Sequence, residues 1–189
     1  MNVTEIRVVD CVPFENYPFK IQDNSDMEML IDSIKESGVL IPIVVRPKGK
    51  EYEILSGHRR IYACKMAGID KVPAIIRELS RDEAVIFMVD SNLHREGLLP
   101  SEKGFAYKMK LEAMKHQGRT SDQLGQKLTS IQALADSSSD SKTQVQRYIR
   151  LTFLEKPLLD LVDEGRIALT PAVELSHLLP EEQMNLIET

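Results

Sequence analysis

Residues 54–64 read ILSGHRRIYAC. The pattern predicts a strand, a Ser-Gly turn, and then a helix whose first turn contains Arg59 and Arg60. The start of a helix already presents unpaired backbone N–H groups and partial positive charge. Two arginines there are unfavourable unless an anion binds, and guanidinium groups match the geometry of phosphate. The stretch therefore indicates a phosphate site, the alternative being two solvated surface arginines after an ordinary glycine turn.

Strands and helices alternate on both sides of this stretch. The expected strands are 6–9, 40–46, 52–55 and 72–76, and the expected helices are 26–37, 59–67 and 81–92. The strands at 40–46 and 52–55 are expected to pair as a hairpin through a turn at 47–50. This mixture predicts an α+β domain over residues 1–99.

The second half of the chain shows helical patterns only. The expected helices are 102–116, 120–127, 131–136, 142–154, 157–164 and 171–178. In 142–154, Val145, Ile149 and Phe153 recur at four-residue steps, which predicts one apolar stripe facing the core. Residues 100–189 are therefore expected to form a second, all-α domain.

Composition excludes some classes of protein. The chain has 189 residues, is 42% hydrophobic and 28% charged, and contains no apolar run long enough to span a membrane. Its N-terminus lacks the layout of a signal peptide, and its two cysteines form no metal or disulfide pattern. We therefore expect a cytoplasmic protein without a membrane partner.

The net charge of −5 hides a basic segment, since residues 103–150 contain nine Lys/Arg and four Asp/Glu. Within it, residues 136–148 read DSSSDSKTQVQRY, which predicts a helix-turn-helix over about 124–152. Polar side chains near the start of its second helix can reach base edges and phosphates in a major groove. These candidates are Lys142, Thr143, Gln144, Gln146 and Arg147. The alternative is a protein-interaction module, and the local positive charge favours DNA.

A third polar cluster reads SNLHRE at residues 91–96. Asn92 and Arg95 suit a metal-bound phosphate. The alternative is a hydrophilic helix end at which Arg95 complements the helix dipole.

Taken together, these stretches resemble the ParB family of DNA-partition proteins. Residues 30–46, 57–75 and 92–102 are similar to the three conserved boxes of the family, and the helix-turn-helix follows at the family's position. The resemblance covers residues 5–185. It implies a ParB/sulfiredoxin-like N-terminal nucleotide-binding domain followed by a helix-turn-helix domain.

The resemblance also implies a site for cytidine triphosphate (CTP) with Mg²⁺. The residues expected at the nucleotide are Pro42, Val44, Arg46, Ser56, Gly57, His58, Arg59, Arg60, Ala63, Asn92, His94, Arg95 and Glu96. Asn92 is also the expected metal ligand. In the family, DNA and nucleotide together close two N-terminal domains of a homodimer into a clamp that slides from a palindromic site. A partition ATPase of the ParA type is a further implied partner, and the implied location is the bacterial nucleoid.

The chain departs from the family pattern at two positions. His58 replaces a glutamate in the second box, and Ser91 replaces a glutamate that binds magnesium in the third. Because a serine hydroxyl is a weaker ligand for a hard cation than a carboxylate, weak CTP hydrolysis at most is expected. The sequence also offers no candidate for an N-terminal tail that stimulates an ATPase, or for a C-terminal dimerisation domain.

Two other functions fit this pattern. One is a transcription regulator or nucleoid adaptor that kept the fold without nucleotide control, which the changes at positions 58 and 91 favour. The other is a nucleotide-dependent enzyme, either a kinase or a sulfiredoxin-like protein. For the latter the catalytic thiol is missing from the motif, because Cys64 lies about two helical turns beyond it.

Overall fold

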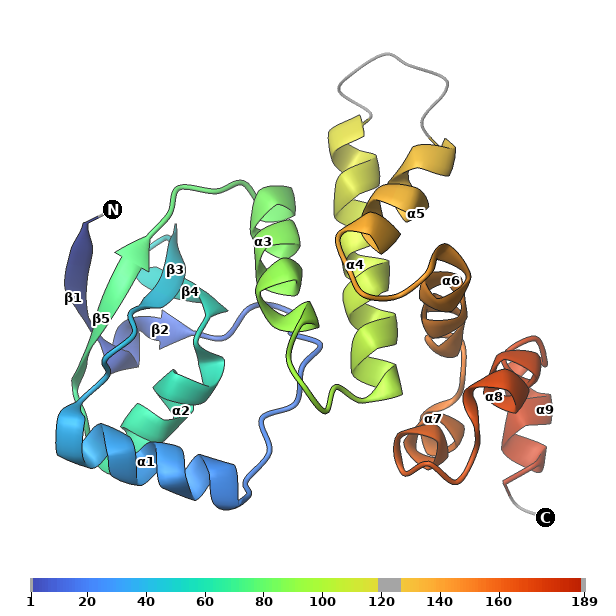
Figure 1. The fold of residues 1–189 in the computed structure, drawn as a ribbon, viewed down its shortest axis with the longest axis horizontal. Coiled ribbons are helices and arrows are strands. Elements are labelled where there is room, and N and C mark those ends of the chain that lie inside the picture. The colour runs from blue at the N-terminus through green and yellow to red at the C-terminus, as the bar shows by residue number, and fades with distance from the viewer. Residues whose placement is uncertain (1, 119–126, 188–189) are drawn as a thin grey trace. The chain divides into compact units, whose positions relative to one another are not determined.

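The computed structural model describes residues 2–118 and 127–187 (Figure 1). The chain divides into two compact units, residues 1–88 and residues 89–189, and each is described by itself. This division falls inside a helix, whereas the sequence places the domain boundary at residues 99–100. Most of the helix expected at 120–127 lies outside the described residues.

The first unit contains a mixed five-stranded sheet in the order β1-β5-β3-β4-β2. Antiparallel and parallel pairs alternate across the sheet: β1 is antiparallel to β5, β5 is parallel to β3, β3 is antiparallel to β4, and β4 is parallel to β2. The strands are β1 (Val3–Arg7), β2 (Cys11–Val12), β3 (Ile43–Lys48), β4 (Glu51–Ser56) and β5 (Lys71–Ile76). The expected hairpin at 40–55 is thereby confirmed.

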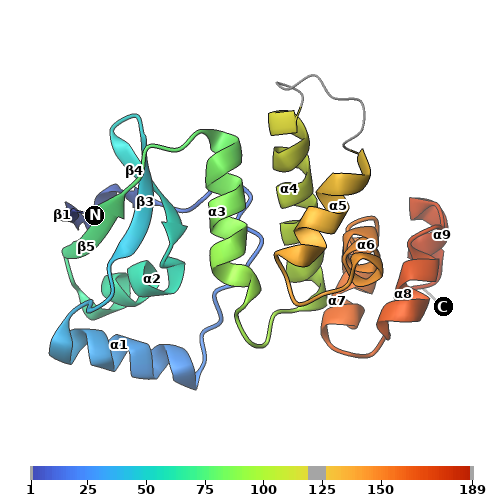
Figure 2. The ribbon, with the colours of Figure 1, turned by 45° about the horizontal axis from the view of Figure 1, so that its top comes forward.

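Two helices, α1 (Ser25–Ser37) and α2 (His58–Ala67), pack against each other in this unit (Figures 1 and 2). Met27 and Ile34 of α1 share a buried core with Ile61 of α2 and with Ile43 and Val45 of β3. Burial of this apolar surface is the main favourable contribution to folding, and it fixes α2 against the sheet.

Two strand boundaries differ from the expected ones. β1 ends at Arg7, and a 3₁₀ turn η1 (Val8–Asp10) follows, in which the Val8 N–H donates to the Asp70 carbonyl at 2.8 Å. β3 begins at Ile43 rather than at residue 40, and the side chains of Leu40 and Ile41 are exposed. The apolar pattern of residues 40–46 alone does not show that the first of them lie outside the sheet.

The described residues of the second unit form helices only, as expected. Helix α3 (Arg81–Leu93) crosses the division between the units. The others are α4 (Pro100–Gly118), α5 (Lys127–Asp136), α6 (Lys142–Leu151), α7 (Lys156–Asp163), α8 (Leu169–Leu175) and α9 (Pro180–Asn185). None of the helices in the described ranges has the length and apolar character of a membrane span.

Helix α4 packs against α5, α6 and α7. The α4–α6 crossing is close because Gly104 lacks a side chain: a Cβ there would lie 2.5 Å from the carbonyl oxygen of Tyr148. The absence of a side chain at one position of α4 therefore sets how near α6 can come.

The apolar stripe expected on residues 142–154 is only partly correct. Val145 is completely buried, but α6 ends at Leu151 and Phe153 is 52% exposed. The chain turns at Thr152, so a residue two positions beyond the helix no longer follows its periodicity. A core of Leu151, Leu154 and Leu158 with residues of α7 and α8 forms instead.

Candidate functional site

The turn between β4 and α2 has the predicted strand–glycine–helix form. Gly57 has φ 106°, a left-handed conformation that favours glycine. A Cβ at this position would lie 2.6 Å from Cγ2 of Ile43 and 3.2 Å from Cζ of Arg60. Both the backbone conformation and the close approach of β3 therefore require glycine. Ser56 precedes it at the end of β4, and the first N–H groups of α2 follow.

The two arginines of this turn have different surroundings. Nη1 of Arg60 donates to the carbonyl oxygens of Ile41 and Pro42, the latter at 2.7 Å. Burial lowers the pKa of Arg60. Arg60 thus links the segment before β3 to α2 through hydrogen bonds. In contrast, Nε of Arg59 is buried and has no hydrogen-bond partner among the described residues. A buried donor of this kind is costly unless a ligand accepts from it, so Arg59 is the better candidate for an anion.

His58 is buried, with a relative exposure of 5%. Its Nε2 accepts a hydrogen bond from the Phe14 N–H at 3.4 Å, and its ring stacks on Tyr17 at a centroid distance of 3.6 Å. Burial lowers the pKa of His58 to about 4, so the ring is neutral at pH 7. The imidazole therefore contributes to packing, while its buried Nδ1, like Nε of Arg59, has no hydrogen-bond partner among the described residues. Ala63, another expected nucleotide residue, is completely buried.

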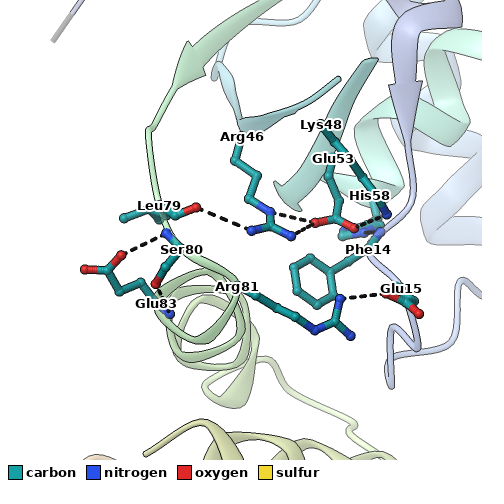
Figure 3. A network of polar contacts seen from close by, with 10 residues as sticks. All are labelled: Phe14, Glu15, Arg46, Lys48, Glu53, His58, Leu79, Ser80, Arg81 and Glu83. Atoms are coloured by element: carbon teal, nitrogen blue, oxygen red, sulfur yellow. Dashed lines mark hydrogen bonds and ion pairs between the residues drawn. The ribbon is translucent and has the colours of Figure 1, made fainter. Parts of the chain in front are cut away.

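A buried ion network lies beside this turn (Figure 3). The carboxylate of Glu53 is fully buried and accepts from Nε of Arg46 at 2.7 Å and from Nζ of Lys48 at 2.9 Å. Burial by itself would raise the pKa of Glu53, but the hydrogen bonds from Lys48 and Arg46 outweigh it and lower the pKa. Arg46, expected at the nucleotide, is therefore ion-paired within the protein.

Sequence reasoning did not single out Glu53. It faces Arg46 across the β3–β4 hairpin, and this cross-strand register was the signal that could have found it. The same network extends to the carbonyl of Leu79, which accepts from Nη1 of Arg46 at 3.4 Å. Next to it, Arg81 pairs with Glu15 at 2.6 Å (Figure 3), so the segment after β2 is held at two points.

The remaining expected nucleotide residues sit in the structure as follows. Pro42 and Val44 are half-buried at the start of β3. Asn92 and Arg95 are half-buried and His94 and Glu96 are exposed around the end of α3, where the Arg95 N–H donates to the Asn92 carbonyl at 3.0 Å. These last four belong to the second unit, whereas the β4–α2 turn belongs to the first.

The donor set for a magnesium ion is weak. In the described part of the chain, three or more His, Cys, Asp or Glu side chains nowhere gather into a metal site. Asn92 offers one neutral amide oxygen, and Mg²⁺ prefers carboxylates together with substrate phosphates and water. The residues present therefore fit a phosphate better than a dedicated metal cage.

The turn between α5 and α6 is anchored on α4. Asp140 accepts from the Tyr107 hydroxyl at 2.6 Å and from Nζ of Lys103 at 3.0 Å, and burial raises the pKa of Tyr107. Nζ of Lys110 donates to Ser137 Oγ at 2.7 Å and also pairs with Asp90. Helix, turn and helix are thus held in one orientation, as the helix-turn-helix prediction requires.

The exposed side of α6 contains the expected DNA-binding residues. Ser141 caps the helix by accepting from the Gln144 N–H at 3.3 Å. Thr143 and Gln146 are exposed, and none of the five candidates is buried; the other three are Lys142, Gln144 and Arg147. The sequence reasoning missed Arg150, which recurs three and four residues after Arg147 and Gln146 and so lies on the same side.

Residues 1–93 match the model of the ParB N-terminal domain family. Two relatives are Stage 0 sporulation protein J of Bacillus subtilis and Chromosome-partitioning protein Spo0J of Thermus thermophilus. The first is 34% identical over 167 residues, which are 88% of this chain and 55% of that protein. The second is 30% identical over 182 residues, which are 96% of this chain and 62% of that protein.

Two solved structures share the fold. One is the C-terminally truncated chromosome-partitioning protein ParB of Caulobacter crescentus complexed to the centromeric parS site. Its TM-score is 0.59 at 23% identity, with 98% of this chain and 91% of that chain covered. The other is a Pnob8-like ParB-N domain with a TM-score of 0.62 at 17% identity, covering 100% of this chain and 89% of that one.

These likenesses define the class of protein as a ParB-type N-terminal domain followed by a helical domain. Through residues 1–93, the chain contains a domain of the ParB N-terminal domain family. It spans 55% and 62% of the length of the two curated relatives described above.

Proposed function

We propose that this chain is a DNA-partition protein of the ParB type, which binds a specific palindromic duplex through α6 and is switched by CTP. The observation that supports DNA binding most directly is the exposed polar side of α6, held in one orientation by the α4 contacts of Asp140 and Ser137. Chromosome partitioning is the role named for the Thermus relative.

Recognition of DNA divides between two kinds of residue on α6. Thr143, Gln144 and Gln146 can exchange hydrogen bonds with base edges in a major groove. Lys142 and Arg147 supply positive charge for phosphates and release counterions on binding. Affinity therefore falls steeply with salt, and specificity depends mainly on the uncharged residues. A palindromic site fits a homodimer, in which two copies of α6 read two half-sites.

Nucleotide binding is proposed for the β4–α2 turn. Ser56, Gly57 and Arg59 are suited to hold the phosphates, because this turn presents the first N–H groups of α2 and because Nε of Arg59 has no partner among the described residues. The guanidinium of Arg59 and the first N–H groups of α2 would donate to the phosphate oxygens of CTP, and the amide oxygen of Asn92 is what this chain would offer to Mg²⁺. Asn92, His94, Arg95 and Glu96, around the end of α3, are proposed as further nucleotide contacts only because the family resemblance implies them. Ser91 in place of a carboxylate leaves hydrolysis weak at most.

The remaining parts of the proposal follow from the family. They are engagement of two N-terminal domains in a homodimer, an interaction with a ParA-type ATPase, and location on the nucleoid in the bacterial cytoplasm.

Selection from a random duplex library tests the DNA part of this proposal. The protein is expected to enrich one palindromic sequence, and binding to that duplex should weaken in Lys142→Ala and Arg147→Ala. Enrichment of no palindrome would contradict it. Calorimetry with CTP and Mg²⁺, with and without the selected duplex, tests the nucleotide part.

A nucleoid adaptor without nucleotide control is the second candidate. It is favoured by the internal contacts of Arg46, Arg60 and His58, three of the residues expected at the nucleotide. No heat with CTP, together with intact binding to the selected palindrome, would establish it. A sulfiredoxin-like enzyme is disfavoured, because Cys64 is completely buried and burial raises the pKa of its thiol.

A further inference from the structure

The guanidinium of Arg150 on α6 is tied to the end of α8. Its Nε donates to Ser176 Oγ at 2.9 Å, and its Nη2 donates to the Ser176 carbonyl at 2.8 Å. Nη2 also lies 2.9 Å from Nδ1 of His177. On one side its Cζ is 4.8 Å from the centroid of the Phe153 ring. Four contacts therefore hold one side chain that starts on the exposed side of α6.

The Arg150–Ser176 hydrogen bond can run in one direction only, because a guanidinium donates and never accepts. Ser176 Oγ donates its only proton to the Val173 carbonyl at 2.6 Å, so towards Arg150 it can act only as an acceptor. Ser176 is 3% exposed, which leaves its hydroxyl little freedom to rotate to water. The serine is thus a fixed acceptor, and it orients the guanidinium through Nε and Nη2.

This arrangement leaves one edge of the guanidinium available. Nη1 of Arg150 makes no hydrogen bond to any other described residue, while Nε and Nη2 face α8. Arg150 follows Thr143, Gln146 and Arg147 by seven, four and three residues, so all four belong to one side of α6. An arginine that is ordered before binding loses less rotamer entropy when it meets a phosphate.

We propose that Ser176, assisted by His177, is a positioning residue for DNA binding, which fixes Arg150 so that its Nη1 edge meets a DNA phosphate. This inference rests on the proposed DNA-binding function. The competing explanation is that the Arg150–Ser176 contact only joins α6 to α8 and stabilises the helical unit. The two explanations differ in whether the effect of Ser176 on DNA binding depends on Arg150.

A double-mutant cycle on the full chain distinguishes them. Affinity for the selected palindrome is measured by fluorescence anisotropy at several KCl concentrations for wild type, Arg150→Ala, Ser176→Ala and the double variant. Arg150→Ala should weaken binding about tenfold and reduce the salt slope by about one, the value for one lost phosphate contact. Ser176→Ala should weaken binding about threefold in the wild-type background and not at all in the Arg150→Ala background.

Matched variants separate positioning from charge and stability. Arg166→Ala removes the same charge from the α7–α8 connection, and Thr170→Ala removes an exposed hydroxyl from α8 itself; both should leave the affinity near that of wild type. Should Ser176→Ala not fold, exposed His177→Ala provides the same cycle with a smaller loss. Thermal melting of each variant confirms that measurements are made on folded protein.

Three results would overturn the inference. Equal loss from Ser176→Ala with and without Arg150 would mean that the contact is only structural. Unchanged affinity in Arg150→Ala and Ser176→Ala, with tight binding by wild type, would refute positioning and leave the proposed function intact. Absence of sequence-specific binding by wild type, in the selection described above, would refute both.

Discussion

The imidazole of His58 stacks on the ring of Tyr17 with a centroid distance of 3.6 Å and an interplanar angle of 17°. This contact explains how a histidine stands at the first residue of α2, where the ParB family pattern has a glutamate. The ring packs against Tyr17, and its Nε2 accepts from the Phe14 N–H. Position 58 therefore joins the segment after β2 to the β4–α2 turn.

Replacing His58 by alanine should destabilise the first unit. The substitution removes a stacked, buried ring and leaves the Phe14 N–H without its acceptor, for an expected loss of about 2 kcal/mol. Urea denaturation gives the free energy of unfolding. His94→Ala is the matched control, because His94 is exposed, and it should unfold like wild type. Equal stability of His58→Ala and wild type would contradict the packing role.

The same histidine should make stability depend on pH. Its pKa is about 4 in the folded chain and about 6.5 when exposed, so between these values the unfolded chain binds more protons. The free energy of unfolding therefore rises with pH across this window. The contribution of His58 is about 3 kcal/mol in full, and it is lost as the pH falls from 6.5 towards 4. Denaturation at pH 7, 6, 5 and 4.5 checks this. His58→Gln should flatten the dependence, because glutamine does not titrate.

The buried ion network should be sensitive to removal of its carboxylate. Glu53→Ala leaves Arg46 and Lys48 without their shared partner, and breaking a buried pair from one side costs about 3–5 kcal/mol. Glu53→Gln should cost less because its amide oxygen still accepts a hydrogen bond. The control is Glu51→Gln, an exposed position on the same strand. Equal melting temperatures for Glu53→Ala and Glu51→Gln would refute a contribution of the network to stability.

The sequence allowed prediction of elements whose signals are local. The Ser56-Gly57 turn, the hairpin and the start of α6 depend on turn residues, periodicity and capping within a few positions. Contacts between segments far apart in the sequence were not predictable in this way. Arg60 holds the carbonyls of Ile41 and Pro42, and Arg150 meets Ser176, across 18 to 26 residues. Likewise, the chain turn after α6 that exposes Phe153 depends on packing against α7 and α8.

Gly104→Ala should disrupt the helical unit. Its Cβ would lie 2.5 Å from the Tyr148 carbonyl oxygen, a backbone atom that can move only with α6. Overpacking of this kind costs about 1–3 kcal/mol and should shift α6 away from α4. Phe105→Ala, at the next and exposed position, is the control. Binding to the selected duplex and the melting temperature should both fall in Gly104→Ala.

Substitution of the two arginines of the β4–α2 turn should affect the free energy of unfolding differently. Arg60→Ala removes the donor to the Ile41 and Pro42 carbonyls, so the free energy of unfolding should fall by about 1–3 kcal/mol. Arg59→Ala removes a buried Nε that has no partner among the described residues, so it should cost little stability.

Ligand binding should show the reverse order. A phosphate that accepts from Arg59 relieves its unsatisfied donor, so Arg59→Ala should abolish the calorimetric heat of CTP binding while the protein stays as stable as wild type. Arg59→Lys keeps the charge but not the planar fork, and should recover only part of the affinity. Arg60→Ala, measured well below its melting temperature, should retain more CTP binding than Arg59→Ala. If Arg60→Ala instead loses CTP binding while its stability is unchanged, the roles assigned to the two arginines are reversed. The phosphates would then be bound by Arg60, and its contacts with the Ile41 and Pro42 carbonyls would not be its main role.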